Sequence, residues 1–582
     1  MSPRQIELTG TIASPGIATG TAFVYAPPDL AYEARVVESV DEELRRLRSA
    51  VTGAIAELVR LKERTRGSLG DEFAHIFRSQ QTIAEDESIL GEIEELIREA
   101  ELSAESALDQ IYTTYRSMFD ELGDDDYNKA RAADLDDVRS RILRLLLGLP
   151  ERDLSTIHDG AIVVAYDLVP SDTALLDPAR VRGIVTETGG PSSHVAILSK
   201  TMGIPAAVAV GRLMTAIGDG DRIALDTTGE AARVVIHPSP EFRTAFLRTE
   251  EDYRRRRDLI EQYRGLPAQT PDGTDIVLSA NVGSTADLIP ARDAGARSVG
   301  LYRSEFLFLN ARTLPNEDRQ YEAYRRAAET FPDGFVIIRT LDVGGDKQIP
   351  ALPLPAEENP FLGKRALRLS LDRPDLFRTQ LRAILRASAH GPVKMMFPMV
   401  GGVPELDQAL SLVEEVKAEL RESGIAFDSD IEVGIMVEVP SAVWVADALA
   451  QRVSFFSVGT NDLTQYLLAA DRLNGDVQEY YRAYDPSVFR AIAEVAAAAA
   501  RHNRWVGVCG ELGGDPRAIP ALIGLGVTEL SMSAGALAEA TWAVRSTPLV
   551  AARELAEQVL SLDAHLQIHA LLGEYQQERE LQ

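Results

Sequence analysis

The second half of the chain alternates short apolar runs with helical stretches, and this alternation restricts the possible folds more than any other feature. The runs are residues 276–280, 298–302, 335–338, 393–397, 432–437, 455–458, 505–508 and 529–532. Eight strand and helix units in succession are typical of a (β/α)₈ barrel. A doubly wound open sheet also alternates strands with helices, so the count and span favour the barrel without excluding the open sheet.

Polar side chains follow several of these runs, where the strands of a barrel would end. Catalytic groups in such barrels project from the carboxyl ends of the strands, so these side chains are expected at one rim. Taken singly, each has a plain explanation as a surface ion pair or a helix cap; their shared position favours a site. The residues concerned are Arg303 and Glu305, Arg339 to Lys347, Glu438, Asn461 and Asp462, and Cys509 to Glu511.

The residue types at this rim indicate an anionic substrate and a hard metal ion. Arginine and lysine hold phosphate or carboxylate groups through charge-assisted hydrogen bonds. Glu438 and Asp462 supply carboxylate oxygens, which suit Mg²⁺ when substrate oxygens and water complete its shell. Cys509 taken alone is more typical of a small buried apolar residue, because reactive thiols need a polar, partly exposed setting.

A second candidate site lies at residues 188–198, where a glycine pair precedes a serine pair and a histidine (TGGPSSHVAIL). The run 181–186 is typical of a strand, the glycines permit a tight turn, and Ser192 or Ser193 can cap a helix that starts there. The backbone N–H groups of that helix would face an anion. The neutral imidazole of His194 is a usable nucleophile near pH 7, so it is a candidate phosphoryl carrier; the alternative is an ordinary strand-to-helix turn.

Composition narrows the class of protein. The 582 residues carry a formal net charge of −29, which disfavours nucleic acid and anionic membranes and favours a basic protein partner or simple solubility. Cys509 is the only cysteine, so we expect neither an intrachain disulfide nor a cysteine zinc cluster. No apolar run approaches the roughly 20 residues of a membrane span, and the first residues do not resemble a signal peptide. These features predict a cytoplasmic protein without membrane insertion.

Changes of pattern along the chain predict four parts. Residues 1–30 and 149–240 form a small α/β domain, with a pair of short strands within residues 6–25 and the His194 helix in its later portion. Residues 31–148 form an acidic, all-helical insertion, whose last helix is closed by Gly148 and Pro150. Residues 241–268 form a charged linker helix, and residues 269–582 form the barrel.

Several motifs together resemble enzyme I of the bacterial phosphotransferase system, the phosphoenolpyruvate-protein phosphotransferase family. The likeness covers nearly the whole chain. The motifs are residues 13–18 (ASPGIA), the GGxxSH element ending at His194, 300–308 (GLYRSEFLF), 339–347, 358–365 (ENPFLGKR), 459–466 (GTNDLTQY) and 507–512 (GVCGEL).

The resemblance implies a reaction and a role for each residue. His194 would accept the phosphoryl group of phosphoenolpyruvate and pass it to a histidine of the phosphocarrier protein HPr, releasing pyruvate, and the small domain would swing on the linker helix. Cys509 would protonate the enolate carbon. The barrel would form a homodimer, and the helical insertion would dock HPr near Arg131. By the same resemblance, the substrate would contact Arg303, Arg339, Lys347, Arg365, Asn461 and Arg472, and Mg²⁺ would bind Glu438 and Asp462.

Two departures from the family pattern and two rival functions remain. Pro191 stands where well-known members have arginine, and Lys364 stands where many have tryptophan.

A pyruvate phosphate dikinase or phosphoenolpyruvate synthase shares the carrier histidine and the barrel, but it needs a large ATP-binding domain for which this sequence has no glycine-rich loop. A regulatory paralogue that signals through its phosphorylation state would not need the intact set of polar residues at the strand ends.

Overall fold

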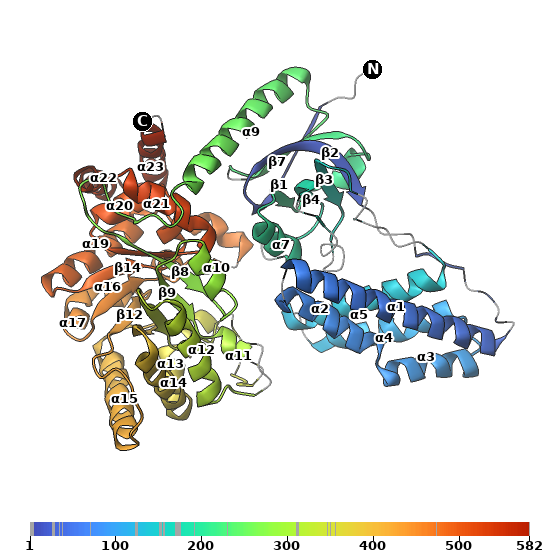
Figure 1. Cartoon of the computed structure of the whole chain (residues 1–582), viewed down its shortest axis with the longest axis horizontal. Helices are drawn as coiled ribbons and strands as arrows, with labels where there is room; N and C mark the ends of the chain where they lie inside the picture. Colours follow the sequence, from blue (N-terminus) through green and yellow to red (C-terminus); the bar gives the residue numbers. More distant parts are fainter. Residues whose placement is uncertain are drawn as a thin grey trace. The chain divides into compact units, whose positions relative to one another are not determined.

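The chain divides into two compact units, Met1–Arg256 and Arg257–Gln582, and each contains a closed barrel of strands (Figure 1). The structure is a computed structural model. It describes residues 5–580 except 26–29, 34, 36, 38, 70, 123–125, 150–153, 155, 156, 169–175, 178, 191, 192, 230, 310–312, 346, 348, 350, 356 and 473, and it leaves out the side chains of 64–76, 120–130, 194, 197, 201, 475 and 580.

The first unit is built on a barrel of mixed strands. Its order is β1-β5-β4-β3-β2-β6-β7, with β2 to β5 joined in parallel and the remaining pairs antiparallel. Buried β-branched and small residues fill these strands; all five residues of β3 are buried, for example. The strands are β1 (Ile6–Ser14), β2 (Ile17–Tyr25), β3 (Ala161–Ala165), β4 (Val181–Thr186), β5 (Ala206–Val208), β6 (Arg222–Asp226) and β7 (Ala232–Ile236).

Residues 6–25 form two strands, as predicted, but both strands are longer than expected. Strands β1 and β2 span nine residues each. They do not pair with each other: β1 lies between β5 and β7, and β2 lies between β3 and β6. Closure of the barrel explains this, because both edges of each strand are occupied by segments far away in the sequence.

Five helices are inserted between β2 and β3 and share a core of their own. They are amphipathic, and α3 for example buries Ile89, Ile93 and Ile97 at a spacing of four residues. Gly148 follows the last helix with φ of +67°, a left-handed conformation that glycine adopts without strain at a helix end. The helices are α1 (Val40–Leu69), α2 (Asp71–Ala84), α3 (Glu87–Glu99), α4 (Ala104–Leu122) and α5 (Asp126–Leu146).

Helix α9 (Pro240–Glu261) is anchored on the first barrel through its first half. Phe242 and Phe246 pack with buried Ala224 and Val235 of the strands. Buried Glu250 accepts a hydrogen bond from Thr19 Oγ1 at 2.6 Å and pairs with Arg182 and Arg254 at 3.1 Å each. The boundary between the compact units falls six residues later in the same helix, after Arg256.

The second unit is an eight-stranded parallel barrel, as the alternating pattern predicted. Its order is β10-β11-β12-β13-β14-β15-β8-β9, and the pairing of β15 with β8 closes it, which excludes the open sheet. The strands are β8 (Val277–Val282), β9 (Ser298–Arg303), β10 (Val336–Arg339), β11 (Val393–Phe397), β12 (Val433–Val437), β13 (Phe455–Val458), β14 (Trp505–Val508) and β15 (Glu529–Met532).

Helices cover the outside of this barrel (Figure 1). No helix in the described ranges is long and apolar enough to cross a membrane. The helices are α10 (Leu288–Asp293), α11 (Phe306–Leu309), α12 (Glu317–Thr330), α13 (Leu367–Asp372), α14 (Pro374–Ala387), α15 (Val403–Glu422), α16 (Pro440–Trp444), α17 (Ala446–Ala450), α18 (Thr460–Leu468), α19 (Pro486–Arg501), α20 (Ile519–Gly524), α21 (Leu537–Arg545), α22 (Leu549–Ser561) and α23 (His565–Glu580).

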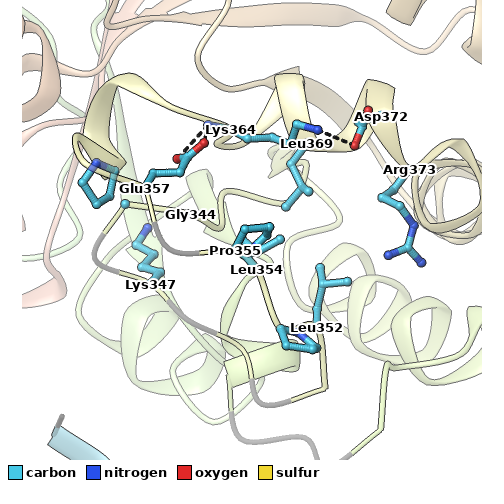
Figure 2. A pocket seen from close by; sticks show the side chains of 13 residues that line it. Gly344, Lys347, Leu352, Leu354, Pro355, Glu357, Lys364, Leu369, Asp372 and Arg373 are labelled. Atoms are coloured by element: carbon cyan, nitrogen blue, oxygen red, sulfur yellow. Dashed lines mark hydrogen bonds and ion pairs between the residues drawn. The ribbon is translucent and has the colours of Figure 1, made fainter. Parts of the chain in front are cut away.

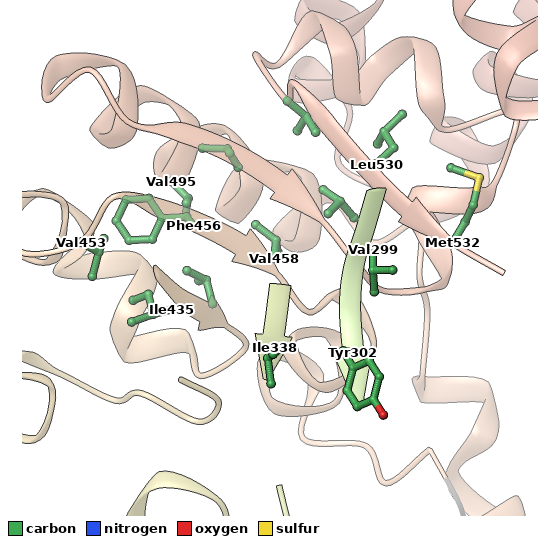
Figure 3. Close-up of a cluster of buried hydrophobic side chains, with 14 of the residues drawn as sticks. Val299, Tyr302, Ile338, Ile435, Val453, Phe456, Val458, Val495, Leu530 and Met532 are labelled. Carbon is green, nitrogen blue, oxygen red and sulfur yellow. The ribbon is translucent and has the colours of Figure 1, made fainter. Parts of the chain in front are cut away.

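The strands of the second barrel alternate between two cores. Outward side chains such as Phe456 and Val458 of β13 pack with Val495 of α19 in the large layer between strands and helices (Figure 3). Inward side chains such as Phe455 of β13 and Ile337 of β10 form a smaller cluster that reaches up to Cys509. Alternate residues of a strand face opposite sides, so one set builds the wall and the other fills the interior.

One inward side chain is a carboxyl group. Glu529 of β15 is buried, and neither of its oxygens has a hydrogen-bond partner among the described residues. It fits because the adjacent strand β14 and the strand β9 on the far side of β8 place glycines against it: a Cβ on Gly300 would lie 2.3 Å from Oε1, and one on Gly507 would lie 2.1 Å from Oε2. Burial raises its pKa to about 8, so it is mainly protonated at neutral pH.

Candidate active site

A cavity of about 280 Å³ lies at the carboxyl ends of the strands of the second barrel. The structure brings together there eight of the residues that the sequence predicted for a site. They lie at the ends of separate strands or in the segments that follow those strands, which is the usual construction of a site in this fold. These eight residues are Arg303, Arg339, Lys347, Glu438, Asn461, Asp462, Arg472 and Cys509.

Two carboxylates hold the basic side chains of Arg339 and Lys347 in place at this cavity. Glu305 follows β9 and is hydrogen-bonded to Arg339 and, at 2.9 Å, to Lys347 Nζ. Asp342 follows β10 and lies 3.1 Å from Arg339 Nη2 and 3.0 Å from Lys347 Nζ. Both carboxylates are buried and shared between the same two cations. The two shared carboxylates therefore fix the positions of the Arg339 and Lys347 side chains at the cavity wall.

Arg365 extends the same network beneath the cavity. Its side chain is fully buried, and it binds Asp342 through Nε at 2.9 Å and Nη2 at 3.2 Å. Its other face lies 3.4–3.5 Å from the two oxygens of Asp462. Arg472 lies 3.6 Å from Asp462 Oδ1 on the solvent side. Arg365 thus joins the carboxylate after β10 to the carboxylate that opens α18.

The cations keep the two linking carboxylates ionised despite their burial. Burial alone raises the pKa of Asp342, but Lys347, Arg339 and Arg365 together hold that pKa well below its usual range. The pKa of Glu305 is likewise lowered by Arg339 and Lys347 against the effect of burial. Buried charges persist only when they are paired and hydrogen-bonded, and this network meets that condition.

Glu438 has the opposite character. Its Oε1 accepts a hydrogen bond from Met399 N at 2.6 Å, whereas its buried Oε2 has no hydrogen-bond partner among the described residues. Burial and then the nearby Asp462 raise its pKa to about 8. A carboxyl group with an unused oxygen beside a second carboxylate suits a divalent cation, which would relieve their repulsion.

The metal-ligating groups of the described residues do not form a complete protein cage. No cluster of three His, Cys, Asp or Glu side chains there is arranged to hold a metal ion. A divalent cation held by the carboxylates of Glu438 and Asp462 would therefore leave most of its coordination positions to other oxygens. Mg²⁺ is commonly bound in this way, through one or two carboxylates with substrate oxygens and water.

Cys509 lies at the end of β14, where it is both a buried residue and part of the cavity wall. It packs in the interior cluster with Leu301, Met396 and Phe455. Burial raises the pKa of its thiol to about 12, so the sulfur carries its proton at neutral pH. The two readings of this cysteine, an apolar core residue and a group at the site, both hold.

Asn461 and Arg303 complete the wall on two sides. Asn461 is the second residue of α18, and its Oδ1 accepts a hydrogen bond from Glu511 N at 2.8 Å. Arg303 ends β9, and its side chain is exposed at the cavity. Five basic side chains thus gather at the carboxyl end of the barrel, in or directly beneath the cavity wall: Arg303, Arg339, Lys347, Arg365 and Arg472.

A second cavity of about 450 Å³ adjoins the first beyond Lys347, which lines both (Figure 2). Leu352, Leu354 and Leu369 form its apolar side. Lys364 lies at its edge, pairs with Asp372 at 2.7 Å and donates its backbone N–H to Glu357. Lys364, which departs from the family pattern, is therefore an exposed ion-pair residue outside the first cavity.

His194 and Arg131 lie in the first unit. His194 is the first residue of α7 (His194–Met202), and Ser193 caps that helix by accepting from Ala196 N, as predicted. The His194 side chain, Ser192 and Pro191 lie outside the described residues. Arg131 is in α5, where it donates to Ser79 Oγ of α2 and lies 3.7 Å from Asp134.

Comparison with known proteins agrees with this geometry. Family models described as PEP-utilising enzyme match residues 9–131 (N-terminal), 157–229 (mobile domain) and 257–548 (PEP-binding domain). A phosphoenolpyruvate-protein phosphotransferase of Geobacillus stearothermophilus is 42% identical over 96% of both chains. Another from Listeria innocua serovar 6a is 39% identical over 98% of this chain and 99% of that one. The chain belongs to the phosphoenolpyruvate-protein phosphotransferase family.

For this family member, reasoning from sequence missed the two carboxylates that organise the cavity. Glu305 and Asp342 lie within motifs quoted for their basic residues, yet neither was assigned a role. Their position two or three residues after strands β9 and β10 was the available signal, because Glu438 and Cys509 also directly follow strands. Acidic residues beside arginines in such loops are candidates for holding those arginines in position.

Proposed function

We propose that this chain transfers the phosphoryl group of phosphoenolpyruvate to its own His194 and then to a histidine of HPr, releasing pyruvate, as the first step of sugar uptake by the phosphotransferase system. The observation that carries the proposal is the cavity lined by four basic side chains, with Arg365 buried beneath it, in a chain that belongs to this family over nearly its full length. A small, highly charged anion is the substrate such a cavity suits.

The basic residues would bind the phosphate and carboxylate groups of the substrate. Arg339 and Lys347 are already oriented by Glu305 and Asp342, so little reorganisation would be needed when the substrate enters. Arg303, Arg365 and Arg472 supply further guanidinium groups, and Asn461 a polar contact. Phosphoryl transfer depends mainly on such positioning and charge stabilisation.

Glu438 and Asp462 would hold Mg²⁺ when it binds together with the substrate. Bound there, the ion would neutralise charge on the substrate oxygens. The unpartnered Oε2 of Glu438 supports this assignment. Because Asp462 contacts Arg365 and Arg472, binding of the ion at Asp462 would also change the charge that these two guanidinium groups experience.

Cys509 would supply the proton that converts the enolate to pyruvate. When the bond from phosphorus to the enol oxygen breaks and the bond to a ring nitrogen of His194 forms, the electron pair remains on the enolate. Carbon 3 of the enolate then takes the proton from Sγ, which becomes a thiolate. A thiol with a pKa of about 12 is protonated before this step, as the role requires.

His194 would receive and pass on the phosphoryl group from the start of α7. The free N–H groups of the first helical turn and the helix dipole favour an anion at that place. HPr would dock on the helical insertion, and Arg131 is our candidate contact because its side chain is about one-third exposed. His194 and the cavity belong to different compact units, so the proposed transfer would need the first unit to swing on α9 between the cavity and HPr.

The barrel unit is our candidate for homodimer formation. Among its described residues, Trp444 at the end of α16 has the highest exposure of the large apolar side chains, 79%, and Val445 next to it is 38% exposed. An exposed apolar patch of this kind supports a contact between copies. Trp444→Ala should weaken self-association in analytical ultracentrifugation, and an unchanged sedimentation coefficient across dilution would remove this face from the interface.

The decisive experiment is incubation with ³²P-labelled phosphoenolpyruvate and Mg²⁺, followed by peptide mapping and a chase with HPr. We expect an acid-labile label on His194, its movement to HPr and one pyruvate per label. His194→Ala should remain unlabelled, with His158→Ala, an exposed histidine of the same unit, as the matched control. Label elsewhere, or pyruvate formed without label, would contradict the proposal.

A further inference from the structure

Asn281, at the carboxyl end of β8, links three neighbouring strands of the barrel through one side-chain amide. Its Nδ2 donates to the carbonyl oxygen of Cys509 at 3.1 Å and to that of Ser531 at 3.4 Å. Its Oδ1 accepts a hydrogen bond from Ser531 Oγ at 2.6 Å. Strand β15 lies between β8 and β14 in the sheet, so the amide reaches across one strand to the residue that follows the next.

These contacts complete the restraint of the peptide groups around Cys509. On the side of β13, Cys509 N donates to Val458 O at 3.0 Å, and the thiol lies 3.7 Å from the same oxygen. On the opposite side, Asn281 holds the carbonyl. With both its N–H and its C=O bound, residue 509 has little freedom to rotate, and the direction of its Cα–Cβ bond is fixed.

A second asparagine, Asn461, binds the backbone two residues further along, here as an acceptor. Asn461 Oδ1 accepts from Glu511 N at 2.8 Å. Gly510 lies between the two restraints, and a Cβ there would come within 2.0 Å of Thr460 Oγ1 and 2.8 Å of Asn461 Oδ1. The segment from Cys509 to Glu511 is therefore bracketed by two amides, of which Asn461 lines the cavity and Asn281 does not.

We propose that Asn281, oriented by Ser531, is a positioning residue that aims the Cys509 thiol at the reacting carbon. This inference rests on the proposed function, in which Cys509 is the proton donor. Asn281 touches no substrate; it acts through the backbone of Cys509. A thiol must lie within hydrogen-bond reach of the carbon it protonates, and displacement of a catalytic group by about 1 Å can cost roughly a hundredfold in rate.

The test compares Asn281→Ala, Asn281→Asp and Ser531→Ala with Ser279→Ala as the matched control. Asn281→Asp keeps the shape but removes the donor to both carbonyls. Ser531→Ala keeps the donor and removes only the hydroxyl that orients it. Ser279 is a buried residue two positions earlier on β8, and its Oγ lies near the Glu529 carboxyl without making a hydrogen bond of standard geometry among the described residues.

Two readouts are measured on the full chain. The first is the rate of alkylation of Cys509 by iodoacetamide, which is unambiguous because the sequence has no other cysteine and which needs no turnover. The second is pyruvate formation, with kcat and the KM for phosphoenolpyruvate determined separately. Methyl chirality of the pyruvate formed from (Z)-[3-²H]phosphoenolpyruvate in tritiated water reports whether protonation is still stereospecific.

We expect both Asn281 variants to be alkylated about tenfold faster, as when one hydrogen bond that restrains the peptide is lost. Their kcat should fall about 10- to 100-fold at unchanged KM, with partial loss of chirality, and Ser531→Ala should lie between them and the unaltered protein. Unchanged alkylation and chirality, or equal effects in Ser279→Ala, would overturn the inference. If the unaltered protein forms no pyruvate, the proposed function fails, and alkylation still decides whether Asn281 restrains Cys509.

Discussion

The two barrels of this chain treat charge in opposite ways. On the strands of the first, Arg233 pairs with Glu7 at the surface, and both side chains are nearly half exposed. At the strand ends of the second, Arg339, Arg365, Glu305 and Asp342 form a connected network with side chains at most 6% exposed. Under the proposed function, the first unit would present the carrier histidine at the start of α7, and the second would hold the anionic substrate with its buried charge network. Carrying the phosphoryl group and binding the substrate would thus fall to separate units.

The largest effect should come from removing a cation of the buried network. Arg365→Met leaves Asp342 and Asp462 without a shared partner, which should cost about 3–5 kcal/mol of unfolding free energy. The loss of a guanidinium group at the cavity should also reduce kcat/KM for phosphoenolpyruvate by about 10³-fold. Urea unfolding and steady-state kinetics measure the two effects.

The matched control is Arg233→Met on the first barrel. Its exposed pair with Glu7 should contribute no more than about 1 kcal/mol, and the reaction with phosphoenolpyruvate should be unaffected. Equal losses of unfolding free energy in Arg365→Met and Arg233→Met would show that the buried network of the second barrel contributes no more to stability than the exposed ion pair of the first.

A smaller, pH-dependent effect should arise from Glu529 inside the second barrel. Burial raises its pKa from 4.5 to about 8, so the folded protein retains a proton that the unfolded chain releases. Its contribution to stability is therefore complete below about pH 4.5 and is lost as the pH rises through 8. Relative to Glu529→Gln, which cannot titrate, the unaltered protein should lose roughly 3 kcal/mol of unfolding free energy between about pH 5 and pH 8.

Urea unfolding at the two pH values tests this, with Glu7→Gln on the first barrel as the comparison. The pKa of Glu7 is lowered by its hydrogen bond to Arg233, so that variant should change the pH dependence in the opposite sense. A parallel pH profile for Glu529→Gln and the unaltered protein would show that the carboxyl group does not hold its proton in the fold.

The smallest effect should appear at the start of α7. Ser193→Ala removes the hydroxyl that accepts from Ala196 N, which should cost about 1 kcal/mol in the stability of this helix. Ser199→Ala is the matched control, because its hydroxyl bonds to Val195 O within the same helix and caps nothing. Hydrogen exchange of residues 194–202 measures both. Equal protection in the two variants would mean that the cap does not stabilise the carrier helix.

The local sequence pattern was sufficient to predict the fold of the second barrel, but it was insufficient to predict the strand pairing of the first. Parallel strands buried on both faces read as continuous apolar runs, so each of the eight runs coincides with a strand to within two residues. Strands β1 and β2 were recognised as strands, but their partners are distant in sequence, and no local signal specifies them.

The sequence predicted which residues form the candidate site, but it did not predict the hydrogen bonds and ion pairs between them. Arg339, Glu438, Asp462 and Cys509 all follow strands and were expected at one rim. The sharing of Arg339 and Lys347 by Glu305 and Asp342, and the reach of Asn281 across β15, depend on distances between separate strands. Such distances are fixed only when the barrel closes.

The anchoring of α9 has a mechanical consequence. Phe242, Phe246 and Glu250 attach residues 240–250 of this helix to the small barrel, and this rigid segment is about 16 Å long. Any bending of α9 would therefore fall in its second half, residues 251–261, where the boundary between the compact units also lies. Because the first half of the helix is fixed to the small barrel, a small change of backbone dihedral angles there would be carried over to that whole barrel.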